Sequence, residues 1–257
     1  MDISSKRKII KYANGERTET EDDIVNEIDL KLAINYKQIS SMIISPQHLE
    51  DFTAGYLLNS GIVNAENELK KLTFDAKNNI MHIHLEDNSV VKEMVFSRLK
   101  PVGCGGGTIL FSKNTKIETK KIKITIRSEK ISELMHKFNK SSELFMKTGG
   151  VHSAAISDGS ELLCFREDIG RHNAIDKVIG NLYRQKTSLE DKVILTSGRI
   201  SSEIVLKLIN PGIQIIISRS APTLKAIELA EENDITLVGF ARSNKFNIYT
   251  GLSRIIE

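Results

Sequence analysis

The sequence predicts an α/β fold in its second half and a strand-rich first half. Three short apolar runs, at 193–196, 213–218 and 235–240, have the length and β-branched content of buried strands. Segments with helical spacing of apolar residues separate them, and short loops join these elements. Alternation of strands and helices with short loops is typical of a parallel sheet covered by helices.

The first half reads mostly as strands joined by turns. Its apolar runs predict strands at 25–34, 39–44, 72–74, 80–85 and 117–126. Asn35-Tyr36-Lys37 is expected to form one turn, and Asn78-Asn79 to form a hairpin turn. Ser45-Pro46 predicts a helix start, with the serine as N-cap and the proline in the first turn, and the helix should stop near Gly61.

The pattern changes near residue 127, where a capped helix from Ser128 to about Phe138 is expected. The 257 residues are enough for one large domain or two modest ones. We therefore predict a strand-rich domain at 1–126, which carries Cys104, and an α/β domain at 127–257.

Composition excludes several classes of protein. The apolar content of 40% and charged content of 27% are ordinary for a soluble globular protein. A formal net charge of +3, without a basic stripe, argues against nucleic acid as a partner. No apolar run approaches the roughly 20 residues that cross a bilayer, and the polar N-terminus does not read as a signal peptide, so we expect a cytoplasmic protein without a membrane partner. Two cysteines cannot form a disulfide framework or an all-cysteine zinc site.

Cys104 stands in a glycine-rich stretch, Gly103-Cys104-Gly105-Gly106-Gly107. The glycines leave the thiol without bulky neighbours, and Arg98 and Lys100 just before it would favour the thiolate. An accessible thiolate suits a sulfur carrier. On these residues alone, a glycine-rich turn with an incidental cysteine is equally acceptable. Cys164 lies in an apolar, strand-like run, which favours a role as core filler.

Two loops that follow predicted strands offer hydroxyl groups and one arginine each where a helix begins. They contain Ser197-Gly198-Arg199 and Ser218-Arg219-Ser220. The carboxyl ends of parallel strands are where open α/β sheets bind ligands, and helix N-termini favour anions. The alternative is that these serines serve only as N-caps. Neither loop contains the Gly-Lys-Ser/Thr ending of a P-loop.

Two further polar stretches, 148–155 and 166–177, contain titratable side chains near element boundaries. The first holds His152, and the second holds Asp168, Arg171 and His172. The second stretch passes from a loop into a helix, which suits hydrogen bonding to a polar ligand. A solvated helix start, and a structural role for His152, remain the alternatives.

Taken together and in this order, the segments resemble the formate dehydrogenase accessory sulfurtransferase (FdhD) family. The resemblance is carried by Ser45–Phe52, the Cys104 loop, Thr148–His152, Glu167–Lys177, Ser197–Arg199, Ser220–Thr223 and Gly239–Arg242. It implies an enzyme, a sulfurtransferase that forms a persulfide on Cys104. A cysteine desulfurase would supply the sulfur, which would pass to the bis-molybdopterin guanine dinucleotide molybdenum cofactor before its insertion into formate dehydrogenase.

The resemblance also implies a three-layer, cytidine-deaminase-like fold for the C-terminal domain, and a homodimer. The guanine nucleotide ends of the cofactor would need phosphate and base contacts, and no metal site is expected in the protein itself. The residues expected to bind the cofactor are Phe240, Ala241, Arg242, Ser243, Asn244, Lys245, Ser197, Gly198, Arg199, Ser220, His152, Asp168, Arg171 and His172.

One departure from the family pattern concerns the sulfur chemistry. Many members carry Cys-Gly-x-Cys-Gly, whereas Gly107 stands at the second cysteine position here. A relay through two neighbouring thiols is therefore excluded, and a non-catalytic chaperone that binds the cofactor is the alternative function. A zinc deaminase is rejected, because His152 is followed by Ser153 and Ala154 instead of the His-x-Glu motif, and no Cys-x-x-Cys pair exists.

Overall fold

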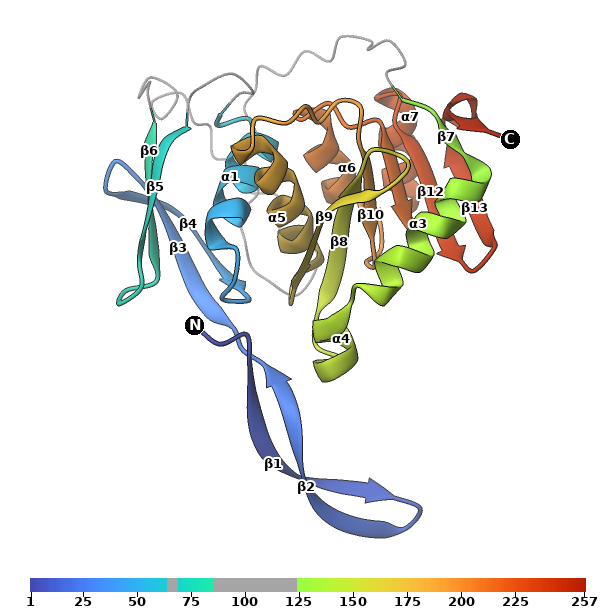
Figure 1. Cartoon of the computed structure of the whole chain (residues 1–257). Helices are drawn as coiled ribbons and strands as arrows, with labels where there is room; N and C mark the ends of the chain where they lie inside the picture. The colour runs from blue at the N-terminus through green and yellow to red at the C-terminus, as the bar shows by residue number, and fades with distance from the viewer. Residues whose placement is uncertain (64–68, 86–123) are drawn as a thin grey trace.

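The protein is organised around a six-stranded mixed sheet (Figure 1). The computed structural model describes residues 1–63, 69–85 and 124–257, so Cys104 and most of the strand predicted at 117–126 lie outside the described residues. The strand order is β13-β12-β11-β10-β8-β9. Their bounds are β8 His152–Ser157, β9 Leu162–Asp168, β10 Val193–Thr196, β11 Ile215–Ser218, β12 Thr236–Arg242 and β13 Lys245–Thr250.

The predicted parallel arrangement is confirmed for the three central strands, because β11 pairs in parallel with both β10 and β12. The sheet as a whole is mixed, since β8 is antiparallel to β10 and β9, and β13 is antiparallel to β12. The prediction did not cover these outer strands. Turns at 158–161 and 243–244 join β8 to β9 and β12 to β13, and such short links allow only antiparallel neighbours.

Helices cover both faces of this sheet (Figure 1). One face packs against α3 (Ser128–Lys140), and the other against α5 (Arg171–Arg184), α6 (Ser202–Ile209) and α7 (Leu224–Glu232). The period-two alternation of the strands divides the two cores: Val193 and Leu195 face α3, while Ile194 faces α5. The likeness of these layers to a cytidine deaminase stays a prediction.

A second, four-stranded sheet with order β4-β3-β6-β5 lies beside α1 (Leu49–Asn59). Its strands are β3 Ile28–Ile34, β4 Lys37–Ile44, β5 Leu69–Asp75 and β6 Ile80–Leu85, which confirms the predicted strands and turns of this region. Leu30 and Leu32 are fully buried and belong to the same apolar cluster as Ile175 and Val178 of α5. One core therefore joins the two predicted domains, whose boundary at 126/127 stays a prediction.

The helix start at Ser45 was predicted wrongly. The helix begins at Leu49, and its N-cap residue is His48 in the left-handed conformation. Ser45 is fully buried, and both its N–H and its hydroxyl donate to a carboxylate oxygen of Asp168. The Ser45 hydroxyl therefore donates to a tertiary partner, instead of accepting a hydrogen bond from the N–H groups of the helix as an N-cap would.

A long antiparallel hairpin, β1 (Ser4–Ala13) and β2 (Glu16–Val25), projects from the body and was not predicted (Figure 1). Its turn is Asn14-Gly15, with φ of 52° and 85°, and Asn-Gly is a strong signal for such a turn. The remaining short elements are α4 Glu143–Thr148, β7 Ile126–Arg127, the 3-10 helix Leu252–Arg254 and β14 Ile255–Ile256.

Helices α1 and α5 approach each other closely through one glycine each. A Cβ added to Gly180 would lie 1.8 Å from the carbonyl oxygen of Asp51 and 2.4 Å from the nitrogen of Gly55. A Cβ added to Gly55 would lie 1.9 Å from the carbonyl oxygen of Asp176. Only glycine fits at these two positions, and the contact fixes the first half of the chain against the helix that leads away from β9.

We predict that Gly180→Ala lowers the free energy of unfolding by about 3 kcal/mol or more, because backbone atoms occupy the space of the methyl group. Alanine normally stabilises a helix relative to glycine, so helix propensity alone would raise the free energy of unfolding. A decrease therefore reports the steric effect. Urea denaturation measures it. Gly149→Ala, where the added Cβ meets nothing within 4 Å but φ is 65°, is the control and should cost about 1 kcal/mol.

Candidate functional site

Most of the predicted binding residues meet at one edge of the central sheet. This is the edge where the parallel strands β10, β11 and β12 end, where β8 begins, and where β9 ends and α5 starts. We call it the sheet-edge site. It comprises His152, Arg171, His172, Ser197–Arg199, Arg219, Ser220 and Phe240–Lys245.

Serine hydroxyls hold the two loops of the sheet-edge site together. The Ser197 hydroxyl accepts a hydrogen bond from the Ser153 N–H (2.9 Å), and the Ser220 hydroxyl donates to the Ser197 carbonyl (2.9 Å). The Ser218 hydroxyl donates to the Gly198 carbonyl (2.7 Å). The N-cap alternative does not apply to Ser197 or Ser220, because Ser201 and Thr223 occupy the N-cap positions of α6 and α7. These hydroxyls give the loops a fixed shape.

Gly198 lets the start of α5 pack onto the first of these loops. A Cβ at this position would lie 2.8 Å from Cβ and 2.9 Å from Cδ of Arg171. The stem of Arg171 therefore crosses the loop backbone at van der Waals distance. Because Gly198 has no side chain, it lies in direct contact with Arg171, and both are predicted binding residues.

Burial lowers the pKa of both histidines of the sheet-edge site, which favours their neutral form. The pKa of His152 is lowered by burial first and then by the positive charges of Arg171 and Arg219. Its Nδ1 lies 3.3 Å from the Ser197 hydroxyl. Burial also lowers the pKa of His172, and Glu203, whose Oε2 is 3.1 Å from His172 Nε2, opposes that shift. Neutral imidazoles can both donate and accept hydrogen bonds here.

Basic side chains surround these histidines. Arg199, Arg242 and Lys245 are exposed, and Arg219 is partly exposed. The Arg242 Nε donates to the Arg219 carbonyl (3.0 Å), and the Arg219 guanidinium lies 5.2 Å from the ring centroid of Phe145. The residue set implied by the resemblance omitted Arg219, although the argument from strand ends had named the loop that contains it. A concentration of cations above backbone loops favours binding of anions.

Strand β12 is bulged where it reaches the site. Phe240 has a φ of 52° and the residue is 41% exposed, and its N–H donates to the Ser220 carbonyl (3.1 Å). An exposed aromatic residue in the left-handed region is uncommon and marks a constrained position. Ser243 and Asn244 form the turn to β13. Ala241 is buried among the side chains that pack on α3, so its predicted contact with a ligand stays a prediction.

Asp168 lies behind the sheet-edge site, and its side chain is wholly buried. One carboxylate oxygen is 2.6 Å from the Lys177 ammonium, which is also wholly buried, and accepts hydrogen bonds from Ser45. The other accepts from the Gly170 N–H and the Asn173 amide. Burial lowers the pKa of Lys177, and the charge of Asp168 opposes that shift. Asp168 therefore shapes the 169–173 turn that carries Arg171 and His172, and a direct contact with a ligand stays a prediction.

Comparison with known proteins agrees with the resemblance noted in the sequence. A model described as the FdhD/NarQ family matches residues 25–256. The chain belongs to this family. The "Sulfur carrier protein FdhD" of Bacillus pumilus is 38% identical over 99% of this chain and 98% of its own, and that of Bacillus subtilis is 36% identical over the same shares.

A solved structure has the same fold. It is a crystal structure from Desulfotalea psychrophila, described as a formate dehydrogenase accessory protein, with 26% identity and a TM-score of 0.80. The similarity covers 99% of this chain and 100% of that one. Within the described part of this family member, no helix is long and apolar enough to cross a membrane.

The structure places only one of the two cysteines. Cys164 is buried on β9, as the sequence predicted, and burial raises its pKa to about 11. Its thiol is therefore protonated and shielded near neutral pH. Cys104 lies outside the described residues, so its position relative to the sheet-edge site stays a prediction.

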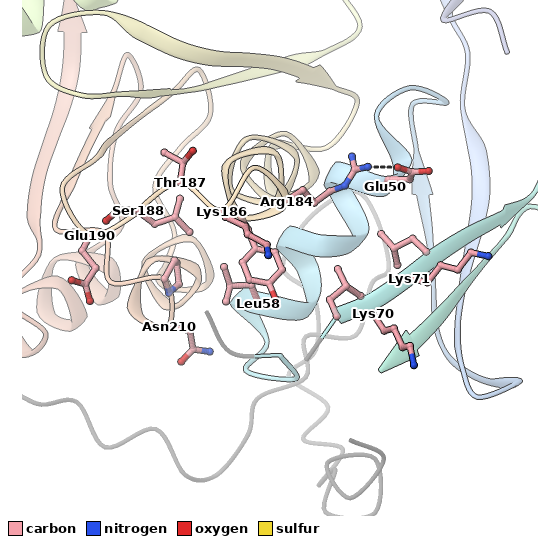
Figure 2. Close-up of a pocket in the computed structure, with 15 residues that line it drawn as sticks. Glu50, Leu58, Lys70, Lys71, Arg184, Lys186, Thr187, Ser188, Glu190 and Asn210 are labelled. Atoms are coloured by element: carbon pink, nitrogen blue, oxygen red, sulfur yellow. Dashed lines mark hydrogen bonds and ion pairs between the residues drawn. The ribbon is translucent and has the colours of Figure 1, made fainter. Parts of the chain in front are cut away.

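A cavity of about 660 Å³ lies away from the sheet-edge site (Figure 2). Its lining comes from both ends of α1, from β5, from the end of α5, and from the segments 186–190 and 210–211 that lead into β10 and β11. Since strands β10 and β11 begin at this edge and end at the other, the cavity lies at the opposite edge of the sheet. None of the predicted binding residues lines it.

Removing either member of the Asp168–Lys177 pair should destabilise the protein strongly. We expect Asp168→Asn and Lys177→Met each to lower the free energy of unfolding by about 3–5 kcal/mol, because each leaves a buried charge without its partner. The double variant should cost less than the sum of the single ones. Urea unfolding of all four proteins measures the coupling, and strict additivity would contradict the pairing.

Proposed function

We propose that this protein is a sulfur carrier that serves formate dehydrogenase through a persulfide on Cys104. The names of relatives that match almost its whole length support the carrier role. The observation that carries the assignment to Cys104 is the state of Cys164. With that thiol buried and its pKa raised to about 11, Cys104 is the cysteine left for thiolate chemistry.

Loading would be a thiol–persulfide exchange with a cysteine desulfurase. The Cys104 thiolate attacks the outer sulfur of the donor persulfide, a new S–S bond forms, and the old S–S bond breaks with its electron pair on the donor thiolate. The product is a persulfide on Cys104, and no external oxidant or reductant is consumed. Arg98 and Lys100 would favour the thiolate that starts the reaction.

The sheet-edge site would hold the cargo, the bis-molybdopterin guanine dinucleotide cofactor, by its nucleotide ends. Arg199, Arg219 and Arg242 would contact phosphate oxygens, which guanidinium groups recognise in bidentate fashion. The exposed ring of Phe240 offers a face on which a planar base can stack. His152 is expected to be neutral near pH 7 and to contribute hydrogen bonds instead of charge.

The second candidate function is a chaperone that binds the cofactor without transferring sulfur. Gly107, at the position of a second cysteine in many family members, favours it. Both candidates use the same sheet-edge site, and only persulfide formation separates them. The homodimer, the cytoplasmic location and the deaminase-like layering remain part of the proposal with either function.

The carrier function predicts that desulfurase and free cysteine add one sulfur atom to the wild-type protein, and that a reductant removes it. Intact-mass spectrometry measures the gain. Cys104→Ser should abolish it, because the nucleophile is lost. Cys164→Ser is the matched control and should keep full loading, and loading that survives in Cys104→Ser would contradict the proposal.

Binding of a guanine nucleotide tests the sheet-edge site separately. We expect Arg242→Ala to weaken GDP binding about tenfold, since a hydrogen bond to a charged group contributes about 1.5–3 kcal/mol. Isothermal titration calorimetry measures the dissociation constant. Arg17→Ala, on the exposed hairpin, removes the same charge outside the site. Equal affinities of the two variants would count against a nucleotide site at this edge.

A further inference from the structure

The side-chain partner of Arg219 in the sheet-edge site is an aromatic ring. The Arg219 guanidinium lies 5.2 Å from the ring centroid of Phe145, a partly buried residue of α4. Among the residues that the structure describes, none forms a hydrogen bond or an ion pair with this guanidinium. A ring attracts a cation through its face and uses none of the N–H donors. The charge and the donors of Arg219 therefore remain available to a ligand.

Other arginines of the protein are held by carboxylates. The Arg166 guanidinium donates to Asp51, and that of Arg254 donates to Asp234. In such pairs the carboxylate offsets the positive charge and occupies N–H donors, so a phosphate group would have to displace it. An aromatic partner holds an arginine without this competition. The contact of Arg219 with a ring thus suits an arginine that binds an anion.

The first turn of α4, which carries Phe145, is fixed by a carboxylate of β9. The Glu167 carboxylate accepts hydrogen bonds from the Leu144 N–H (2.9 Å) and the Phe145 N–H (3.0 Å). The first N–H groups of a helix have no acceptor within the helix, so an acidic side chain at this end stabilises it. The Ser153 hydroxyl also donates to Glu167 (3.4 Å), and these two residues are partners in the β8–β9 register. The central sheet thereby fixes the backbone of Phe145.

We propose that Phe145 is a positioning residue, which holds the Arg219 guanidinium at the sheet-edge site so that its free donors can bind a phosphate group of the cargo. The inference rests on the proposed function, because that function supplies the phosphate. Phe145 acts through Arg219 and needs no contact with the ligand. A long side chain that is already ordered loses less conformational freedom on binding, which is the advantage that the ring provides.

Binding of GDP, measured by isothermal titration calorimetry on the full-length protein, gives the first test. We expect Phe145→Leu, which stays apolar but lacks the ring, to weaken binding about two- to fivefold, as for a partly exposed cation–π contact. Phe145→Tyr keeps the ring and should keep the wild-type affinity. In an Arg219→Ala background, Phe145→Leu should cause no further loss, because the ring has no partner there. Met146→Ala, at an exposed position of the same helix, is the matched control.

The pKa of His152, followed by NMR in the ligand-free protein, gives a second readout that does not require nucleotide binding. The positive charge of Arg219 is one of the causes that lower this pKa. It should rise in Arg219→Ala, because the charge is removed, and also in Phe145→Leu, because the guanidinium is no longer held in its place. Phe145→Tyr and Met146→Ala should leave the His152 pKa unchanged.

Two results would overturn the positioning role. One is a His152 pKa that is the same in Phe145→Leu as in the wild type. The other is a loss of GDP affinity in the double variant equal to the sum of the two single losses, which would mean that the side chains act independently. An absence of GDP binding by the wild type would contradict the nucleotide site of the proposed function, and the His152 pKa would still decide whether Phe145 positions Arg219.

Discussion

The buried contact between the Asp168 carboxylate and the Lys177 ammonium is the constraint on which the candidate site depends. Two charges removed from water are tolerated only when they are paired and their remaining hydrogen-bonding capacity is used. Here Ser45, Gly170 and Asn173 donate hydrogen bonds to the Asp168 carboxylate and so use its remaining capacity. The pair therefore joins the end of β9 and the first turns of α5 to the approach to α1, which is more than 100 residues away in sequence.

This constraint has a direct consequence for the chemistry of the sheet edge. The turn that follows Asp168 carries Arg171, whose aliphatic stem packs on Gly198. Hydrogen bonds from serine hydroxyls to carbonyl oxygens hold the two serine loops together. Binding groups fixed in this way lose little conformational freedom when a ligand arrives. The site is thus built from rigid loops at strand ends, with cations outside and neutral histidines within.

The packing of α1 on α5 determines where the four-stranded sheet lies. Because Gly55 and Gly180 let the two helix backbones meet, the four-stranded sheet stands close to the end of α5. The cavity of about 660 Å³ lies in this region, bounded by β5 on one side and by the segment after α5 on the other. This cavity and the sheet-edge site consequently lie at opposite edges of one sheet.

Sequence alone determined the strands of β10, β11 and β12, the helices between them and the apolar character of Cys164, because local periodicity and burial follow from the order of residues. It also placed the loops at 197–199 and 218–220 at one edge of the sheet, since the ends of parallel strands meet there. The other residues of the sheet-edge site came from the resemblance to the FdhD family. The tertiary structure decided the partner of Ser45 and the internal role of Asp168, because these side chains meet from segments more than 100 residues apart and no local pattern records such a meeting. The antiparallel pairs β8–β9 and β12–β13 follow from short turns that the sequence analysis did not identify.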